Sequence, residues 1–168
     1  MRALPIAHCW LAGTRSGYFT SKDWQAWADE IIVLEEQPPI WLIEMSTADD
    51  LTSLLSALRG KFNEEKTGGS AEDTLGDATI GFYYLMYEDG RLSEVDLLRL
   101  VGEEAEGGMT TLECETAYEF LNEIEVQPRE THGSMKGRLQ ALLGPFGDTA
   151  LRLLRVMEEC KSRVKSGR

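Results

Sequence analysis

The stretch that decides the fold runs from Gly17 to Ser46, GYFTSKDWQAWADEIIVLEEQPPIWLIEMS, and it holds three of the four tryptophans. Thr20 is a favourable N-cap, and Asp23 follows it at the spacing of a capping box. Beyond this cap, apolar residues recur at helical period on one face, namely Trp24, Trp27, Ala28, Ile31 and Ile32. The pattern predicts an amphipathic helix from Thr20 to about Glu36, which the pair Pro38-Pro39 stops.

Apolar segments on either side of this stretch predict further helices. Residues 4–12 fit either a helix or an edge strand, and we favour the helix. After the proline pair comes a short segment whose predicted packing residues are Ile40, Trp41, Ile43 and Met45. A third helix is then predicted from an apolar stripe formed by Leu51, Leu54, Leu55, Leu58 and Phe62. Residues 63–76 are rich in Gly, Ser and charge without periodicity, so we expect a mobile loop there.

The second half of the chain repeats the same combination of caps and apolar stripes. Residues 78–90 have the aromatic content of a strand but also helical spacing, and we favour a helix capped by Asp77. Capping boxes at Ser93 and Thr110 predict two more helices. Gly144-Pro145 predicts a stop, followed by a last helix from Asp148 to about Val164. We therefore expect an all-α protein, a single domain over residues 1–168, built as an orthogonal or layered bundle of about seven to nine helices.

Composition indicates an ordinary globular protein. The 168 residues are 42% hydrophobic and 27% charged, which argues against a disordered or membrane class. No stretch approaches the roughly 20 apolar residues of a membrane span, and the N-terminus is a poor signal peptide, so we expect a cytoplasmic protein. Cys9, Cys114 and Cys160 are odd in number and far apart, which favours reduced thiols.

Charge is the most informative functional feature. The net charge is −12, and residues 67–127 alone carry 15 acids against 2 bases, a local charge of −13. In that region Glu115, Glu119 and Glu123 follow at i, i+4 and i+8 without a lysine or arginine among them. Such a stripe is commonly a solvated face, but the missing counter-charges favour a protein partner with a basic surface. The predicted partner-binding residues are Glu103, Glu104, Glu106, Glu115, Glu119 and Glu123. Nucleic acid would be repelled by this region.

Catalytic and metal-binding motifs are not evident. His8 and Cys9 are neighbours in sequence, so their side chains point in different directions and do not form a dyad. His132 is interpreted as a polar loop residue. With two histidines and three scattered cysteines, the chain lacks the spacing of a closed zinc site, and it has neither a calcium-binding loop nor a glycine-rich phosphate loop. We expect no cofactor and no enzymatic activity.

A family resemblance rests on the stretch from Gly17 to Ser46. The segments GYFTSKDWQAWADEII and PPIWLIEMS resemble the N-terminal region of small helical bacterial proteins that look like immunity proteins of polymorphic or contact-dependent toxin systems. The positions that carry the resemblance are Trp27, Ala28, Asp29, Pro38, Trp41, Glu44 and Ser46. They are packing and capping residues, so the resemblance implies a helical fold, and through the family it implies binding of a toxin.

The function expected from these observations is that of an acidic, non-enzymatic binding protein that neutralises a cognate toxin by covering a basic surface. The alternative is a helical adaptor or assembly protein that has no toxin partner, and an unrecognised hydrolase is the third reading. Electrostatic attraction would speed association and make it depend on salt, as an inhibitor of a toxin requires.

Overall fold

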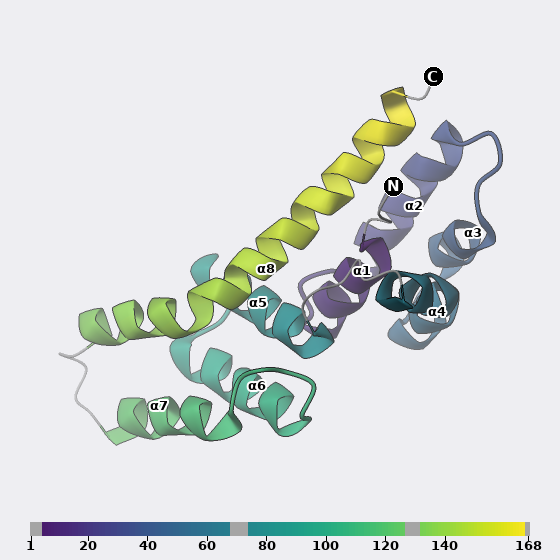
Figure 1. Cartoon of the computed structure of the whole chain (residues 1–168). Coiled ribbons are helices and arrows are strands. Elements are labelled where there is room, and N and C mark those ends of the chain that lie inside the picture. Colours follow the sequence, from purple (N-terminus) through teal and green to yellow (C-terminus); the bar gives the residue numbers. More distant parts are fainter. Residues whose placement is uncertain (1–4, 68–73, 127–131, 167–168) are drawn as a thin grey trace. The chain divides into compact units, whose positions relative to one another are not determined.

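The computed structural model describes residues 5–67, 74–126 and 132–166. These residues form α-helices and no strand (Figure 1). The helices are α1 (Ile6–Arg15), α2 (Ser21–Leu34), α3 (Ile40–Thr47), α4 (Leu51–Thr67), α5 (Leu75–Glu88), α6 (Glu94–Glu106), α7 (Cys114–Val126) and α8 (His132–Ser166). The prediction of an all-α protein with seven to nine helices is confirmed.

The chain divides into two compact units. The first comprises residues 1–72 and 152–168, and the second comprises residues 73–151. The boundary at Leu151 lies within α8, so this helix contributes its N-terminal part to the second unit and its C-terminal part to the first. A single domain over residues 1–168 stays a prediction.

Helix α2 organises the first unit, as the capping pattern predicts. The backbone N–H of Thr20 donates to Asp23 Oδ2 at 2.6 Å, which fixes the start of the helix. Trp24 and Trp27 are buried on its inner face, and the indole N–H of Trp24 donates to the carbonyl of Ala48 at 2.8 Å. This bond ties α2 to the residue that follows α3, against which α2 packs.

Aromatic rings fill the space between α1, α2 and α3. Trp10 of α1 is buried, with its ring centroid 4.6 Å from that of Phe19 and 5.5 Å from that of Trp27. Trp27 in turn stacks on Trp41 at 6.5 Å. The preference for a helix over an edge strand at residues 4–12 is confirmed, since this segment forms α1 from Ile6 onward.

The last turns of α8 are attached to the first unit by charge as well as by packing. Lys161 and Lys165 both contact the carboxylate of Glu30 on α2, at 2.6 Å and 3.1 Å. Their hydrogen bonds lower the pKa of Glu30. Further along the same side of α8, the thiol of Cys9 donates to Met157 Sδ at 3.1 Å. The C-terminal part of α8 is thus part of the core of this unit.

In the second unit, α5 is the most deeply buried helix and packs against α6, while α6 packs against α7. The core of the second unit consists of Ile80, Tyr83, Tyr84, Leu97, Leu98, Val101, Ala117, Met135, Leu139 and Leu143. Gly81 and Gly147 allow α5 and the N-terminal part of α8 to approach closely, because a Cβ on Gly81 would overlap the carbonyl of Phe146 and one on Gly147 would overlap the ring of Tyr84.

Several predicted boundaries are wrong. Helix α4 continues through Thr67 and α5 begins at Leu75, so the predicted loop 63–76 is helical at both ends, and its residues 68–73 lie outside the described part. The cap of α5 is Thr74, whose hydroxyl accepts from the N–H of Asp77 at 3.0 Å, so Asp77 is inside the helix. Helix α7 begins at Cys114, four residues after Thr110.

The predicted stop at Gly144-Pro145 is also wrong, because α8 is continuous from His132 to Ser166 with Pro145 inside it. Proline there removes one backbone hydrogen bond. Buried residues on both sides of it, Leu143 and Ala150, hold the two halves of the helix against protein, and this packing outweighs the local cost.

The apolar residues of α3 and α4 are only partly buried. Leu42, Met45, Leu54 and Leu58 are inside, whereas Ile40, Ile43, Leu51 and Leu55 are 73%, 47%, 37% and 41% exposed. The expectation that Ile40 and Ile43 pack into the core, and that Leu51 and Leu55 share the inner face of α4, is therefore wrong.

Candidate functional site

Helices α6 and α7 bring most of the predicted partner-binding glutamates together. The two helices pack side by side in the second unit (Figure 1). Glu103 and Glu106 on α6 and Glu115 and Glu119 on α7 are all exposed. We call these four residues the acidic face.

Tyr118 of α7 contacts the α6 part of the acidic face. Its ring packs over Gly102, where any larger residue would collide with it, and its hydroxyl donates to Glu106 Oε1 at 2.8 Å. This hydrogen bond, together with the nearby charges of Glu106 and Glu103, raises the pKa of Tyr118. The two glutamates of α6 therefore lie within electrostatic range of one phenol on α7.

The start of α7 adds a further carboxylate to the same neighbourhood. The thiol of Cys114 donates to Glu115 Oε2 at 3.4 Å. The pKa of Cys114 is raised by this bond first and also by the charges of Glu115 and Glu106. Glu106 thus acts on both Tyr118 and Cys114, which places carboxylates of α6 and α7 around the same pair of side chains. The arrangement concentrates negative potential, but it holds no nucleophile with a lowered pKa.

Two of the six predicted residues do not share this arrangement. The carboxylate of Glu123 accepts hydrogen bonds from both terminal nitrogens of the Arg138 guanidinium, one of them at 3.1 Å. This pairing lowers the pKa of Glu123. Arg138 also lies over the ring of Phe120, 4.6 Å from its centroid. The sequence stripe therefore has a counter-charge from α8 at its C-terminal end. Glu104 is half-buried and has a partner of its own.

The loop between α6 and α7 is held by a buried carboxylate on α5. Asp77 Oδ1 accepts from the hydroxyl of Thr110 at 2.5 Å, from the N–H of Thr111 at 2.7 Å and from the hydroxyl of Thr111 at 3.1 Å. One residue earlier, the N–H of Gly76 donates to the carbonyl of Met109 at 3.0 Å. These bonds fix the connection between the two helices that carry the acidic face.

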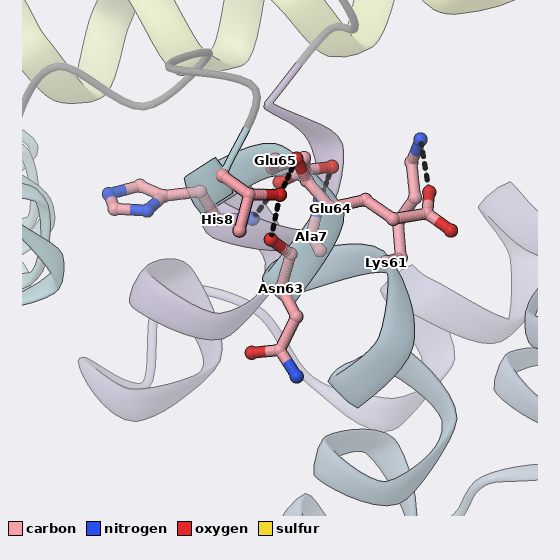
Figure 2. Close-up of polar contacts among 7 residues, drawn as sticks. Ala7, His8, Lys61, Asn63, Glu64 and Glu65 are labelled. Carbon is pink, nitrogen blue, oxygen red and sulfur yellow. Dashed lines mark hydrogen bonds and ion pairs between the residues drawn. The ribbon is translucent and has the colours of Figure 1, made fainter.

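A second buried carboxylate, in the first unit, was not foreseen at all. Glu65 of α4 is 0% exposed, and its two oxygens accept from the backbone N–H groups of Ala7 and His8 at 2.9 Å and 3.0 Å (Figure 2). The N-cap of α1 is Pro5, which offers no side-chain acceptor. Glu65 therefore caps α1 from a distance of 57 to 58 residues along the chain.

Burial is the largest influence on Glu65 and raises its pKa. The two N–H donors and the charge of Lys61 act in the opposite direction and are the weaker effect. No pattern in the sequence marks this residue, because Glu64, Glu65 and the charged residues around them have the composition of a solvated loop.

His8 and Cys9 do not form a catalytic pair. The ring of His8 is buried and stacks on Phe62, with centroids 5.8 Å apart. Burial raises the pKa of the Cys9 thiol, and the negative charge of Glu65 adds to the shift. A nucleophilic cysteine requires the opposite, a lowered pKa and access to solvent. His132 is the first residue of α8.

The described residues were also compared with the requirements of a metal site and of a membrane-spanning helix. Within the described ranges, no group of three or more His, Cys, Asp or Glu side chains is placed to hold a metal ion. Over the same residues, no helix has both the length and the apolar character needed to cross a bilayer. Comparison with known proteins finds no matching family model, curated protein or solved structure.

Proposed function

We propose that this chain is a non-enzymatic binding protein of the immunity type, which neutralises a cognate toxin by covering a basic surface with its acidic face. The observation that carries the proposal is the convergence of exposed carboxylates from α6 and α7 around Tyr118 and Cys114. The resemblance of residues 17–46 to immunity proteins points to the same class of partner.

The arrangement suits rapid, specific association better than it suits catalysis. Several carboxylates on one rigid pair of helices create a local negative potential, which accelerates encounter with a basic partner above the roughly 10⁵ to 10⁶ M⁻¹s⁻¹ of an uncharged pair. Tyr118 adds a large side chain of the kind enriched in protein interfaces. The Asp77 bonds hold the α6–α7 connection and so limit the ordering cost of binding.

The first test concerns the partner. If the chain is an immunity protein, a toxin reading frame lies beside its gene, and co-expression of the two restores the growth that the toxin domain abolishes alone. A neighbouring secretion or regulatory gene, with no protection from any adjacent toxin, would favour an adaptor instead.

The second test concerns the surface. The variant Glu103→Gln, Glu106→Gln, Glu115→Gln removes three charges but leaves amide oxygens that can accept from Tyr118 and Cys114. We expect it to stay folded, to associate with the toxin about tenfold more slowly at low salt, and to show a weaker salt dependence.

A matched control removes the same charge from the first unit, in the variant Asp29→Asn, Glu35→Gln, Glu36→Gln, at three exposed positions. This control should associate at nearly the parent rate. Equal association rates for the parent and the α6–α7 variant at low salt would contradict the acidic face as the docking surface.

A further inference from the structure

In the first unit, exposed apolar side chains lie on α3 and at the start of α4, two helices that follow each other in the chain. Ile40 and Ile43 are three residues apart and so lie on one side of α3, while Leu51 and Leu55 are four apart on one side of α4. The two helices pack against each other and are joined by three residues (Figure 1). We call these four residues the apolar stripe.

Helix α3, which contributes Ile40 and Ile43 to the apolar stripe, is unusual because it is apolar on two sides. Leu42 and Met45 are buried against the unit, and Ile40 and Ile43 point away from it. A helix that is hydrophobic all round is normally covered on all sides. Ile40 in particular keeps 73% of its surface in water, although burial of such a side chain contributes favourably.

Most of the charges near the apolar stripe are negative, and the exception is Arg59, which is exposed one turn after Leu55 on α4. Between Lys22 and Arg59 the sequence contains eight acidic residues and no basic residue. Three of the acids, Glu44, Asp49 and Asp50, are exposed on α3 and on the connection to α4. The surface therefore combines apolar side chains with a border on which three exposed acids outnumber one exposed base.

This combination decides between the possible occupants. A second copy of the chain, with net charge −12, would bring the same acidic border against itself, and an anionic lipid surface would also be repelled. A helix with an apolar stripe flanked by lysines and arginines matches both the centre and the border.

We propose that the apolar stripe binds a basic amphipathic helix of a protein partner, with apolar anchors against Ile40, Ile43, Leu51 and Leu55 and with cations beside Glu44, Asp49 and Asp50. This surface lies in the first unit, whereas the acidic face lies in the second. The inference does not depend on the partner being a toxin.

The test uses the full chain and a defined probe. The probe is a fluorescein-labelled helix-forming peptide with leucines at i, i+3, i+4 and i+7 and lysines elsewhere, and its control is a peptide of the same composition in an order without helical period. We expect the parent to bind the amphipathic peptide at least about tenfold more tightly than the control peptide in fluorescence anisotropy.

Matched variants separate the apolar stripe from general attraction between a basic peptide and an acidic protein. Ile40→Gln with Ile43→Gln should weaken binding about tenfold, because two anchors are lost without a change of charge. Val126→Gln changes an equally apolar residue that is 84% exposed on α7 and should bind as the parent does. The glutamine variant of the acidic face should preserve the preference for the amphipathic peptide.

Four results would overturn the inference. One is equal affinity of the parent for the two peptides, and another is unchanged binding by the Ile40→Gln, Ile43→Gln variant. The third is a parent that sediments as a dimer and becomes monomeric in that variant, since the occupant would then be a second copy. Amide chemical-shift changes on α3 and α4 should accompany peptide binding, and changes confined to α6 and α7 would contradict the assignment.

Discussion

Replacement of Glu65 tests the long-range cap of α1. In Glu65→Ala, the N–H groups of Ala7 and His8 lose their acceptor inside the protein. An unsatisfied buried donor costs about 1 to 3 kcal/mol, and removal of a buried charge offsets part of the two losses. We expect a decrease of about 2 to 4 kcal/mol in the free energy of unfolding, a large share of the roughly 5 to 15 kcal/mol of a typical domain.

Glu65→Gln separates the hydrogen bonds from the charge. The glutamine keeps an amide oxygen for one N–H and carries no buried charge, so we expect a loss of about 1 kcal/mol or less near neutral pH. The neighbouring change Glu64→Gln is the control, because that side chain is exposed and forms an ion pair with Lys61 at 3.7 Å (Figure 2). It should be close to neutral.

The pH dependence of Glu65 has a definite sign. Its folded-state pKa is raised by burial, so between the ordinary value of 4.5 and the raised one the folded protein binds the proton more tightly than the unfolded chain. The stabilising contribution of protonated Glu65 is complete below that window and is lost as pH rises through the folded pKa. The advantage of the parent over Glu65→Gln should therefore be larger near pH 5 than near pH 7.5.

Urea unfolding followed by tryptophan fluorescence suits this measurement, because Trp10, Trp24, Trp27 and Trp41 are the four tryptophans of the chain and all belong to the first unit. An advantage of the parent that grows with pH would refute the reasoning, since the N–H groups and Lys61 would then outweigh burial and lower the pKa. A stable Glu65→Ala variant would refute the cap itself.

The remaining predictions concern packing. Trp27→Ala should lose about 3 to 5 kcal/mol, because the ring is 4% exposed between Trp10 and Trp41, and a melting temperature equal to that of the parent in circular dichroism would contradict the orientation of α2. Gly81→Ala should lose about 1 to 3 kcal/mol, since its Cβ would overlap the carbonyl of Phe146, whereas Gly137→Ala in α8 meets nothing within 4 Å and should gain about 0.5 to 1 kcal/mol from helix propensity. Urea unfolding followed by circular dichroism measures both, and equal effects of the two glycine changes would contradict the close approach of α5 and α8.

Features specified by neighbouring residues were predictable from the sequence. The caps at Thr20 and Ser93 occur where the spacing places them, with Ser93 accepting from the N–H of Asp96 at 3.1 Å. Helical period identified α2 and favoured a helix for α5 in spite of its aromatic content. These signals act within one or two turns of a helix, so the residues involved can be found without knowledge of the rest of the structure.

Features that depend on residues far apart were not predictable. Nothing near Glu65 in the sequence indicates that it meets α1, and nothing near Glu123 indicates that Arg138 pairs with it. Pro145 is a helix breaker by local rules, and only the packing of α8 on both sides of it explains why the helix continues. In the same way, helical period places Leu54 and Leu55 on one face of the predicted helix, while the tertiary structure buries only Leu54.

The division of α8 between the two units has a consequence for the order in which the protein can form on the ribosome. Residues 73–151 are one uninterrupted stretch, so the second unit has all its residues before synthesis of the chain reaches residue 168. The first unit begins with the earliest helices but lacks Met157, Lys161 and Lys165 until the end of α8 has been made. Because domains commonly fold as soon as their residues are present, the later-made unit should complete its fold before the earlier-made one. In a chain that ends at Leu151 and is followed by a linker long enough to span the ribosomal exit tunnel, α5, α6 and α7 should accordingly be protected from proteolysis, while the N-terminal helices stay open to cleavage.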